Sequence, residues 1–365
     1  MLGYNIGLLS AHILERAGRW LLRSGIQEPC GGVARYYRTD LQRNLPLSTE
    51  ITGYAVGTLL YLSTATTQQE YDVQALAAAR FLTRHAWTGQ SMPFEIEPER
   101  DRLAYFFDCG IILSSLLAAW RATREREFFD VAKALGIAMA TDFASSEGDY
   151  HPVLKLPGKE PVERDSTRWS RSAGCYQLKA AMGFCTLAEE TSDPRFREPY
   201  DRLLESALRS YSSFLPGHPD PSKVVDRLHA FVYFLEGLLP RAGEKRCAAA
   251  LCDGIRKVAH YLGETASEFE RADVYAQLLR IRIFADWVGA APLDRHAAEH
   301  EAAMLAGFQA DSDDPREDGG FYFGRRAGEW LPYVNPVSTA FGLQALALWE
   351  HHSSGCPPAH WRVLI

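Results

Sequence analysis

The chain has 365 residues, enough for one large domain or two ordinary ones, and 47% of them are hydrophobic, which is enough to build a substantial core. Its 39 Lys and Arg residues are outnumbered by 46 Asp and Glu residues and form no basic stripe, so we expect no nucleic-acid partner. The first residues lack a basic segment followed by a long apolar one, and the apolar run at 110–120 is too short to cross a bilayer. We therefore expect no signal peptide and no membrane span.

Seven cysteines are scattered along the chain, and this odd number favours reduced thiols and a cytoplasmic location. Cys247 and Cys252 lie five residues apart on one expected helix, without a second pair nearby. Because a structural zinc site needs four ligands, we interpret both as small core residues. The sequence predicts no metal and no other cofactor.

The spacing of apolar residues predicts an all-α protein. They recur every three or four positions through nearly the whole chain, whereas alternating β-branched runs are almost absent. In chain order, helices are expected near 4–24, 47–65, 69–86, 105–123, 126–142, 168–190, 196–214, 225–240, 244–262, 271–288, 292–308 and 335–351.

These helices are of two alternating kinds. One kind is amphipathic, and the other is apolar on most sides with polar or small residues in its first turn, so the second kind should lie inside. The interior helices have first-turn landmarks about 45 to 65 residues apart: Glu50, Asp108, Ser172, His229, Asp273 and Ser338. A repeat of one outer and one inner helix predicts a closed ring of six hairpins, an (α/α)6 toroid. No linker-like segment divides it, so we expect a single domain over 1–365.

Four long connections interrupt the helices, at 25–46, 87–104, 143–167 and 309–334, and connections of this length in compact domains are often functional. If the chain runs through all hairpins in the same sense, every inner helix begins at the same end of the ring. Helix amino-terminal ends present unpaired N–H groups and a partial positive charge, which suits a polar or anionic ligand. We expect the mouth of a binding cavity at that end.

Two carboxylates should face this mouth. Glu50 and Tyr54 lie one turn apart on the first inner helix, and Asp108 opens the second. Such a pair, in partly apolar surroundings that push the pKa values apart, supplies the acid and the base or nucleophile of glycoside hydrolysis. The alternative is structural: Glu50 and Asp108 cap their helices or pair with Arg35 or Arg168.

A polar stripe on a later inner helix offers different chemistry. His229, Tyr233 and Glu236 recur at helical spacing in an otherwise apolar segment. A histidine beside a phenol can move protons at neutral pH, as an epimerase or lyase requires. In the alternative interpretation, His229 is a hydrogen-bonded core residue.

The next inner helix carries Arg271, Asp273, Tyr275, Gln277 and Arg280, which would form a face that reads hydroxyl and carboxylate groups. Arginine is suited to a bidentate contact with a uronate or sulfate, although an internal ion pair with Asp273 explains the same residues. Aromatic side chains near the loops can stack on sugar rings. The predicted substrate-binding residues are Tyr54, Trp169, Arg271, Asp273, Tyr275, Arg280 and Tyr322.

The segments TEITGY at 49–54, FDCG at 107–110 and NPVSTAF at 335–341 resemble an uncharacterised group of bacterial (α/α)6-toroid proteins associated with polysaccharide metabolism. More distantly, the hairpin pattern is similar to six-hairpin glycosidases, N-acylglucosamine 2-epimerases and glucuronyl C5-epimerases. None of their catalytic motifs matches residue by residue. Unsaturated glucuronyl hydrolases use paired aspartates at inner-helix ends, which only Asp108 and Asp273 resemble.

Together, the residues and the resemblance predict a carbohydrate-active enzyme that acts on an oligosaccharide or polysaccharide. A glycoside hydrolase with paired carboxylates at the toroid mouth is favoured. A uronyl epimerase or polysaccharide lyase that uses His229 and Tyr233 is the first alternative. A non-catalytic glycan-binding protein is the second. The oligomeric state and the identity of the sugar stay open.

Overall fold

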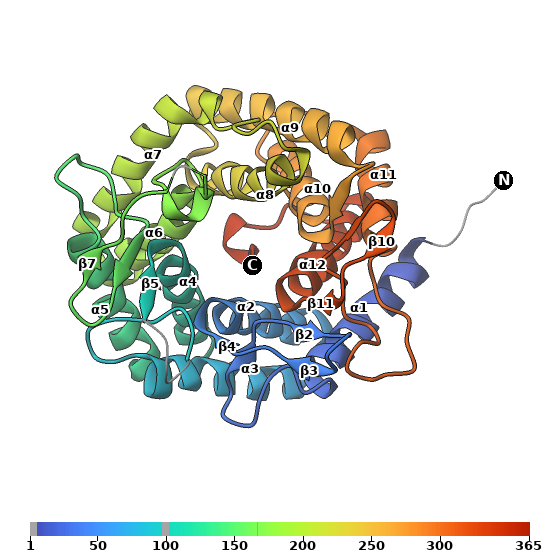
Figure 1. Cartoon of the computed structure of the whole chain (residues 1–365), viewed down its shortest axis with the longest axis horizontal. Helices are drawn as coiled ribbons and strands as arrows, with labels where there is room; N and C mark the ends of the chain where they lie inside the picture. Colours follow the sequence, from blue (N-terminus) through green and yellow to red (C-terminus); the bar gives the residue numbers. More distant parts are fainter. Residues whose placement is uncertain (1–5, 97–101, 166) are drawn as a thin grey trace.

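The computed structural model describes residues 6–96, 102–165 and 167–365. Within these ranges, the α-helices form two concentric rings around one axis, and the predicted (α/α)6 toroid is confirmed (Figure 1). The helices are α1 (Ile6–Arg23), α2 (Thr49–Thr66), α3 (Gln69–Phe81), α4 (Phe106–Thr123), α5 (Arg126–Asp142), α6 (Gln177–Thr191), α7 (Glu198–Ser210), α8 (Pro221–Gly237), α9 (Lys245–Thr265), α10 (Ala272–Trp287), α11 (Arg295–Ala306) and α12 (Pro336–Ser353).

The even-numbered helices form the inner ring and the odd-numbered helices the outer ring (Figure 1). Each inner helix contacts the next one, and α12 contacts both α2 and α1, so the ring closes. The sequence explains the two layers. The outer helix α7 buries only one stripe, Tyr200, Leu203, Leu204 and Ala207, whereas the inner helix α12 is buried on all sides over most of its length.

Two predicted boundaries were wrong. The helix expected at 168–190 begins only at Gln177, and residues 169–171 form a 3-10 turn instead. The Ser172 Oγ donates a hydrogen bond to the Asp165 carbonyl, and this local bond competes with helix formation. The helix expected from 225 begins at Pro221. Asp220 caps it by accepting from the Ser222 amide at 2.9 Å, with proline at the first helical position.

Short strands organise the long connections. Antiparallel pairing joins them into four small sheets with the orders β1–β4, β11–β2–β3, β5–β6–β7 and β10–β9–β8. Four of them, β4, β5, β8 and β11, lead directly into inner helices, so the sheets lie at the amino-terminal end of the inner ring. The strands are β1 (Val33–Ala34), β2 (Tyr37–Arg38), β3 (Arg43–Asn44), β4 (Leu47–Ser48), β5 (Leu103–Tyr105), β6 (Val153–Lys155), β7 (Glu160–Pro161), β8 (Phe269–Arg271), β9 (Gly324–Arg326), β10 (Glu329–Trp330) and β11 (Tyr333–Val334).

The helix α4 is the one helix of the described ranges that is long and apolar enough to cross a membrane by length and composition. It belongs to the inner ring, and most of it is buried inside the protein. A core helix of a globular protein has the same properties, so α4 is accounted for by its place in the toroid.

After α12, the chain turns back into the ring. A 3-10 turn at Trp361–Val363 precedes Ile365, which lies near the axis (Figure 1). The Ile365 amide donates to the Oε1 of Gln344 on α12 at 3.2 Å, and Ile365 itself is buried. The last described residues therefore form part of the toroid interior.

Candidate active site

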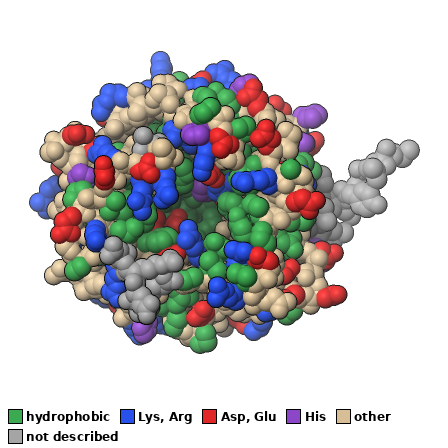
Figure 2. Space-filling view, in the orientation of Figure 1, with side chains coloured by type: hydrophobic (Ala, Val, Ile, Leu, Met, Phe, Trp, Pro, Cys, Tyr) green, Lys and Arg blue, Asp and Glu red, His purple; other side chains and the backbone are tan. Residues whose placement is uncertain are grey.

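The face of the molecule that carries the short strands is hollowed at the centre of the ring, and charged and hydrophobic side chains surround the hollow (Figure 2). Helices α2, α4, α10 and α12 all begin at this face, each directly after a strand or a capping residue. First-turn side chains of several inner helices therefore converge there, as the sequence predicted. We call this hollow the mouth.

Glu50 and Asp108 lie in the first turns of the neighbouring helices α2 and α4. Neither residue is an N-cap. Ser48 caps α2 by accepting from the Ile51 amide, and Tyr105 occupies the N-cap position of α4. Glu50 is half-buried, whereas only 7% of Asp108 is exposed and its Oδ2 has no hydrogen-bond partner in the described structure.

The two carboxyl groups influence each other. Burial raises the pKa of Glu50 to about 7, although the positive charge of Arg35 opposes this. Burial, together with the charge of Glu50, raises the pKa of Asp108 well above its usual range. Both carboxyl groups therefore hold their protons to a higher pH than an exposed carboxyl group does, and because they interact, they titrate as a pair.

The two arginines that offered a structural explanation have other partners. Arg35 pairs with Glu95 at 3.1 Å, and Arg168 lies 3.6 Å from Asp165. In the described ranges, Glu50 forms no ion pair with either arginine, and Arg35 acts on it only through its charge. The carboxylate pair is thus available for a ligand.

His229 on α8 is held by two neighbours. Its Nδ1 lies 2.7 Å from the Oε1 of Gln277 and 3.4 Å from the Oδ2 of Asp273, both on α10. Two acceptors beside Nδ1 place the imidazole proton there and leave Nε2 with a lone pair. Burial lowers the pKa of His229 to about 4, so the ring is neutral at pH 7, and 10% of its side chain is exposed.

Arg271 fixes Asp273 in place. Its Nε and Nη2 donate to the two carboxylate oxygens of Asp273 at 2.9 and 2.5 Å, and its Nη1 donates to Asp226 at 2.7 Å. The guanidinium also stacks on Phe323 at 4.4 Å. The internal ion pair that the sequence offered as an alternative is present. Because these contacts occupy the guanidinium, Arg271 organises the site and is not free to clamp a carboxylate.

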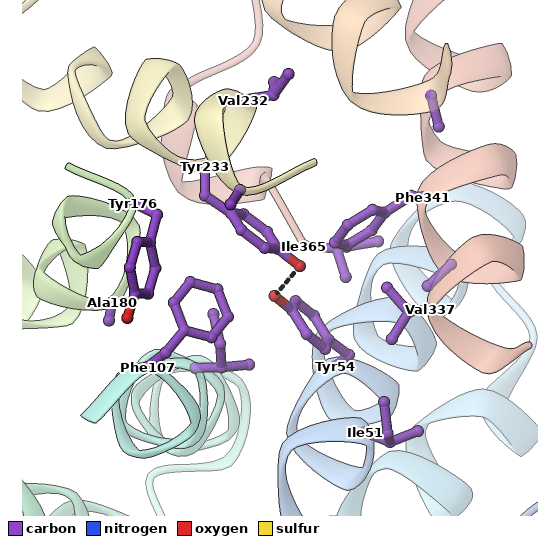
Figure 3. Close-up of a cluster of buried hydrophobic side chains, with 14 of the residues drawn as sticks. Ile51, Tyr54, Phe107, Tyr176, Ala180, Val232, Tyr233, Val337, Phe341 and Ile365 are labelled. Carbon is purple, nitrogen blue, oxygen red and sulfur yellow. Dashed lines mark hydrogen bonds between the residues drawn. The ribbon is translucent and has the colours of Figure 1, made fainter. Parts of the chain in front are cut away.

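Aromatic side chains from four inner helices close the axis below the mouth (Figure 3). We call Tyr54, Phe107, Tyr233 and Phe341 the aromatic floor. The Tyr54 and Tyr233 hydroxyls are hydrogen-bonded at 3.0 Å, and the ring centroids of Phe107 and Tyr233 lie 4.5 Å apart. Tyr233 also contacts the His229 ring at 4.5 Å. Burial raises the pKa of both phenols, so they stay protonated and act as hydrogen-bond donors.

The other predicted site residues are spread over the molecule. Trp169 lies at the mouth, with its ring 6.4 Å from that of His229. Tyr275 faces away from the axis, packs against Phe308 and donates to Glu270 at 2.9 Å. Arg280 is fully buried two turns deeper than Asp273, and Tyr322 stacks on Trp330 in the 309–334 connection. The structure therefore brings together only part of the predicted set: Glu50, Asp108, His229, Asp273, Arg271, Trp169, Tyr54 and Tyr233.

The sequence placed Gln277 in a polar face and Ser338 in a first turn, but the predicted catalytic and substrate-binding residues did not include these two side chains, nor Phe107 and Phe341 of the floor. Gln277 and Ser338 are fully buried on α10 and α12, and the Gln277 Nε2 and Ser338 Oγ have no hydrogen-bond partner in the described structure. Both atoms are therefore free to form a hydrogen bond with a ligand. Both residues are polar positions in otherwise apolar inner helices, and this pattern in the sequence could have identified them as site residues. The described residues contain no group of three or more His, Cys, Asp or Glu side chains that could hold a metal ion.

No protein-family model matches the sequence, and no curated protein matches it significantly. In fold, 90 chains of solved structures match. One is a sugar epimerase from a ruminal bacterium, with a TM-score of 0.73 and 11% identity, covering 94% of this chain and 99% of that one. A D-mannose isomerase has a TM-score of 0.70 and 11% identity over 97% and 100% of the two chains. The GH76A α-1,6-mannanase from Salegentibacter sp. HEL1_6 has a TM-score of 0.58 and 13% identity over 94% and 98%. At these identities, the comparisons establish the (α/α)6 toroid as the class of this protein.

Proposed function

We propose that the protein is a carbohydrate-active enzyme that binds an oligosaccharide or polysaccharide at the mouth and hydrolyses a glycosidic bond. Asp108 is the proton donor, and Glu50 is the base or nucleophile. One observation carries this proposal: two carboxyl groups with raised pKa values lie at the amino-terminal ends of neighbouring inner helices, and neither is consumed by an ion pair in the described ranges. Solved structures with this fold include a mannanase and a sugar epimerase, and this likeness supports a sugar substrate.

The chemistry rests on two interacting carboxyl groups of unequal burial. Glycoside hydrolysis needs one protonated carboxyl group to release the leaving oxygen and one ionised carboxylate to act at the sugar carbon. Asp108 is assigned as the proton donor because it is the more deeply buried of the two, and burial disfavours its charged form. Trp169, half-exposed at the mouth, offers a ring on which a sugar can stack.

The test uses Glu50→Gln and Asp108→Asn, with Asp311→Asn as the matched control, because Asp311 is exposed in a connection and pairs only with Arg16. A panel of oligosaccharides is assayed for new reducing ends. We expect both site variants to lose about 10²- to 10⁴-fold in rate and the control to keep full rate. Hydrolysis that survives both site variants would overturn the proposal. Glycan binding without any product, in the wild type and both variants, would instead identify a binding protein.

A second candidate is epimerisation or isomerisation of a sugar by His229. The specific observation is the anchored Nδ1–H, which leaves a neutral ring with a basic Nε2 beside the mouth. Structures with TM-scores from 0.68 to 0.73 are named as sugar epimerases, cellobiose 2-epimerases and D-mannose isomerase, which supports this candidate.

Exchange with solvent deuterium separates the two candidates. Mannose, cellobiose and uronate-containing oligosaccharides are incubated with the protein in deuterated water. Deuterium at the sugar carbon without chain cleavage, lost in His229→Gln, would favour epimerisation or isomerisation. A new absorbance from an unsaturated product would favour elimination. New reducing ends without deuterium at the sugar carbon would favour hydrolysis. Neither arginine that the sequence offered as a carboxylate clamp serves this role, since Arg271 is bound to Asp273 and Arg280 lies below the floor.

A further inference from the structure

A second cavity of about 580 Å³ lies inside the ring, on the side opposite the mouth. Its wall comes from three inner helices, over 53–65 of α2, 111–122 of α4 and 179–186 of α6, from Asp72 of the outer helix α3, and from residues 361–365. Because these are mostly the later turns of α2 and α4, the cavity opens towards the carboxyl-terminal ends of those helices. Tyr54 of the aromatic floor lines its inner end. This volume is within the range that ligand pockets in proteins have.

Small side chains keep this cavity open. Gly57, Ser115 and Ala118 line it, whereas the same axis is filled at the level of the floor by aromatic rings (Figure 3). Gly57 is informative because a Cβ built there meets no atom nearer than the Ile365 Cγ2, at 4.0 Å. Its φ is not in the left-handed region and no neighbour crowds it, so neither backbone conformation nor packing requires a glycine. A glycine in a helix interior costs about 1 kcal/mol relative to alanine. What the missing side chain leaves is space inside the cavity.

The cations around the cavity are already matched. At its inner end, the Lys179 Nζ lies 3.0 Å from the Glu236 Oε2 and donates to the Ile365 carbonyl at 3.4 Å. At the outer rim, Arg121 donates to Glu190 at 2.6 Å, and Arg362 pairs with Glu189. No cation of the described wall is left without an acceptor, so an anionic ligand would gain little. Asp72 of α3 is the one acidic side chain among the described lining residues and forms no ion pair with them, and most of the remaining wall is apolar.

We propose that this cavity is a second ligand site, which takes an uncharged, mainly apolar molecule such as a ring system or a short chain. Burial of apolar surface along α2, α4 and α6 supplies the binding energy. The rim hydroxyls of Thr64 and Ser114 accommodate a polar end. The site is independent of the proposed hydrolysis, because the aromatic floor separates it from Glu50 and Asp108, and its test measures binding and not turnover.

The test compares two fluorescent probes that share an anilinonaphthalene body. N-phenyl-1-naphthylamine is uncharged, and 8-anilino-1-naphthalenesulfonate carries a sulfonate. Each is titrated into the full chain and into Gly57→Leu, whose new side chain occupies the cavity. Gly263→Leu is the matched control, because it makes the same change in the last turn of the outer helix α9, where a Cβ meets nothing within 4 Å. Thermal unfolding of each variant verifies that it is folded, and both substitutions replace glycine with a better helix former.

We expect the uncharged probe to bind the wild type and Gly263→Leu with saturation at one molecule per chain, and at least ten times more weakly to folded Gly57→Leu. The sulfonated probe should bind the wild type at least ten times more weakly than the uncharged one. Equal binding of the uncharged probe to all three proteins, or no binding at all, would overturn the proposal. Preferential binding of the sulfonated probe, lost in Gly57→Leu, would overturn the uncharged class of ligand. If Gly57→Leu does not fold, Gly57→Ala decides with the same comparison, since its methyl group also points into the cavity.

Discussion

The Lys179, Glu236 and Arg280 cluster offers a strong stability test, because three charged side chains from three inner helices meet inside the ring. The Arg280 Nη2 donates to the Glu236 Oε1 at 2.6 Å, and the Lys179 Nζ lies 3.0 Å from the other oxygen. Glu236 and Arg280 are fully buried, and Lys179 nearly so. One carboxylate thus compensates two cations, and both Glu236 and Arg280 are fully shielded from solvent.

The contacts predict a smaller loss of stability when Lys179 is replaced than when Glu236 or Arg280 is replaced. Glu236→Gln leaves two buried cations without their counter-charge, and it should lower the free energy of unfolding by about 3–5 kcal/mol. Arg280→Met loses the bond to Glu236, a second bond to Gln344 at 3.0 Å and the stacking on Phe341 at 4.1 Å. Its cost should also be about 3–5 kcal/mol. Lys179→Met leaves the bond between Arg280 and Glu236 intact and removes a cation whose pKa burial already lowers. It should therefore cost at most about 2 kcal/mol.

Urea unfolding followed by circular dichroism measures these differences, provided that each variant unfolds in a single transition. Arg195→Met is the control, because Arg195 is 82% exposed and pairs only with Asp193, so its midpoint should equal that of the wild type. The reasoning fails if Glu236→Gln unfolds at the wild-type midpoint, or if Lys179→Met is the most damaging of the three.

Three further predictions concern the mouth and the ring. The hydrolysis rate should rise with pH through about 7 as Glu50 ionises. Because Arg35 lowers the pKa of Glu50, Arg35→Gln should move this rise in rate to higher pH, which rate profiles between pH 5 and 9 in both proteins measure. Arg271→Met should raise the pKa of His229 from about 4, because the positive charge of Arg271 lowers this pKa and the freed Asp273 carboxylate attracts a proton to the ring. An unchanged pKa of His229 in an NMR titration would contradict this. Gly110→Ala should lower the free energy of unfolding by about 3 kcal/mol or more in urea, because the new Cβ would lie 2.3 Å from the Ala180 carbonyl oxygen of α6. The control Gly243→Ala has open space around the new Cβ and should leave the free energy of unfolding unchanged.

The helix order was predictable because each hairpin places one apolar and one amphipathic helix in sequence. The last inner helix illustrates this, since it was expected at 335–351 and extends over Pro336–Ser353. The same regularity predicted that Glu50 and Asp108 would face one mouth. The start of α6 was not predictable in this way, because the Ser172 hydroxyl bonds to the Asp165 carbonyl, and apolar periodicity does not register such a contact.

Depth along the axis was the main quantity that the sequence left undetermined. Asp273 and Arg280 recur at helical spacing on one face of α10, but seven residues correspond to about 10 Å of helix. One side chain therefore lies at the mouth and the other below the aromatic floor. His229 is a converse case: it is the ninth residue of α8, and it reaches the mouth because this helix begins at Pro221 and extends further. No periodicity within a single helix shows how far that helix protrudes relative to its neighbours.

The aromatic floor also decides how a long substrate could bind. Tyr54, Phe107, Tyr233 and Phe341 close the axis below the mouth, so a glycan chain cannot pass through the ring. A hollow closed at its base accepts a chain end more readily than the middle of a chain. If the proposed hydrolysis is correct, sugars should therefore be released from one end of a polysaccharide.

Two measurements on a soluble polysaccharide test this expectation, with the product sizes followed by chromatography and the viscosity of the solution followed in parallel. Small products should appear from the first time points while the viscosity falls slowly, because removal of terminal units shortens each chain only gradually. Phe107→Ala opens the floor without removing a carboxylate, and it should increase the share of intermediate-sized products. A rapid early loss of viscosity with mid-length fragments from the wild type would show that the chain is cut internally. In that case the middle of the polysaccharide chain lies across the mouth, and the chain end does not enter it.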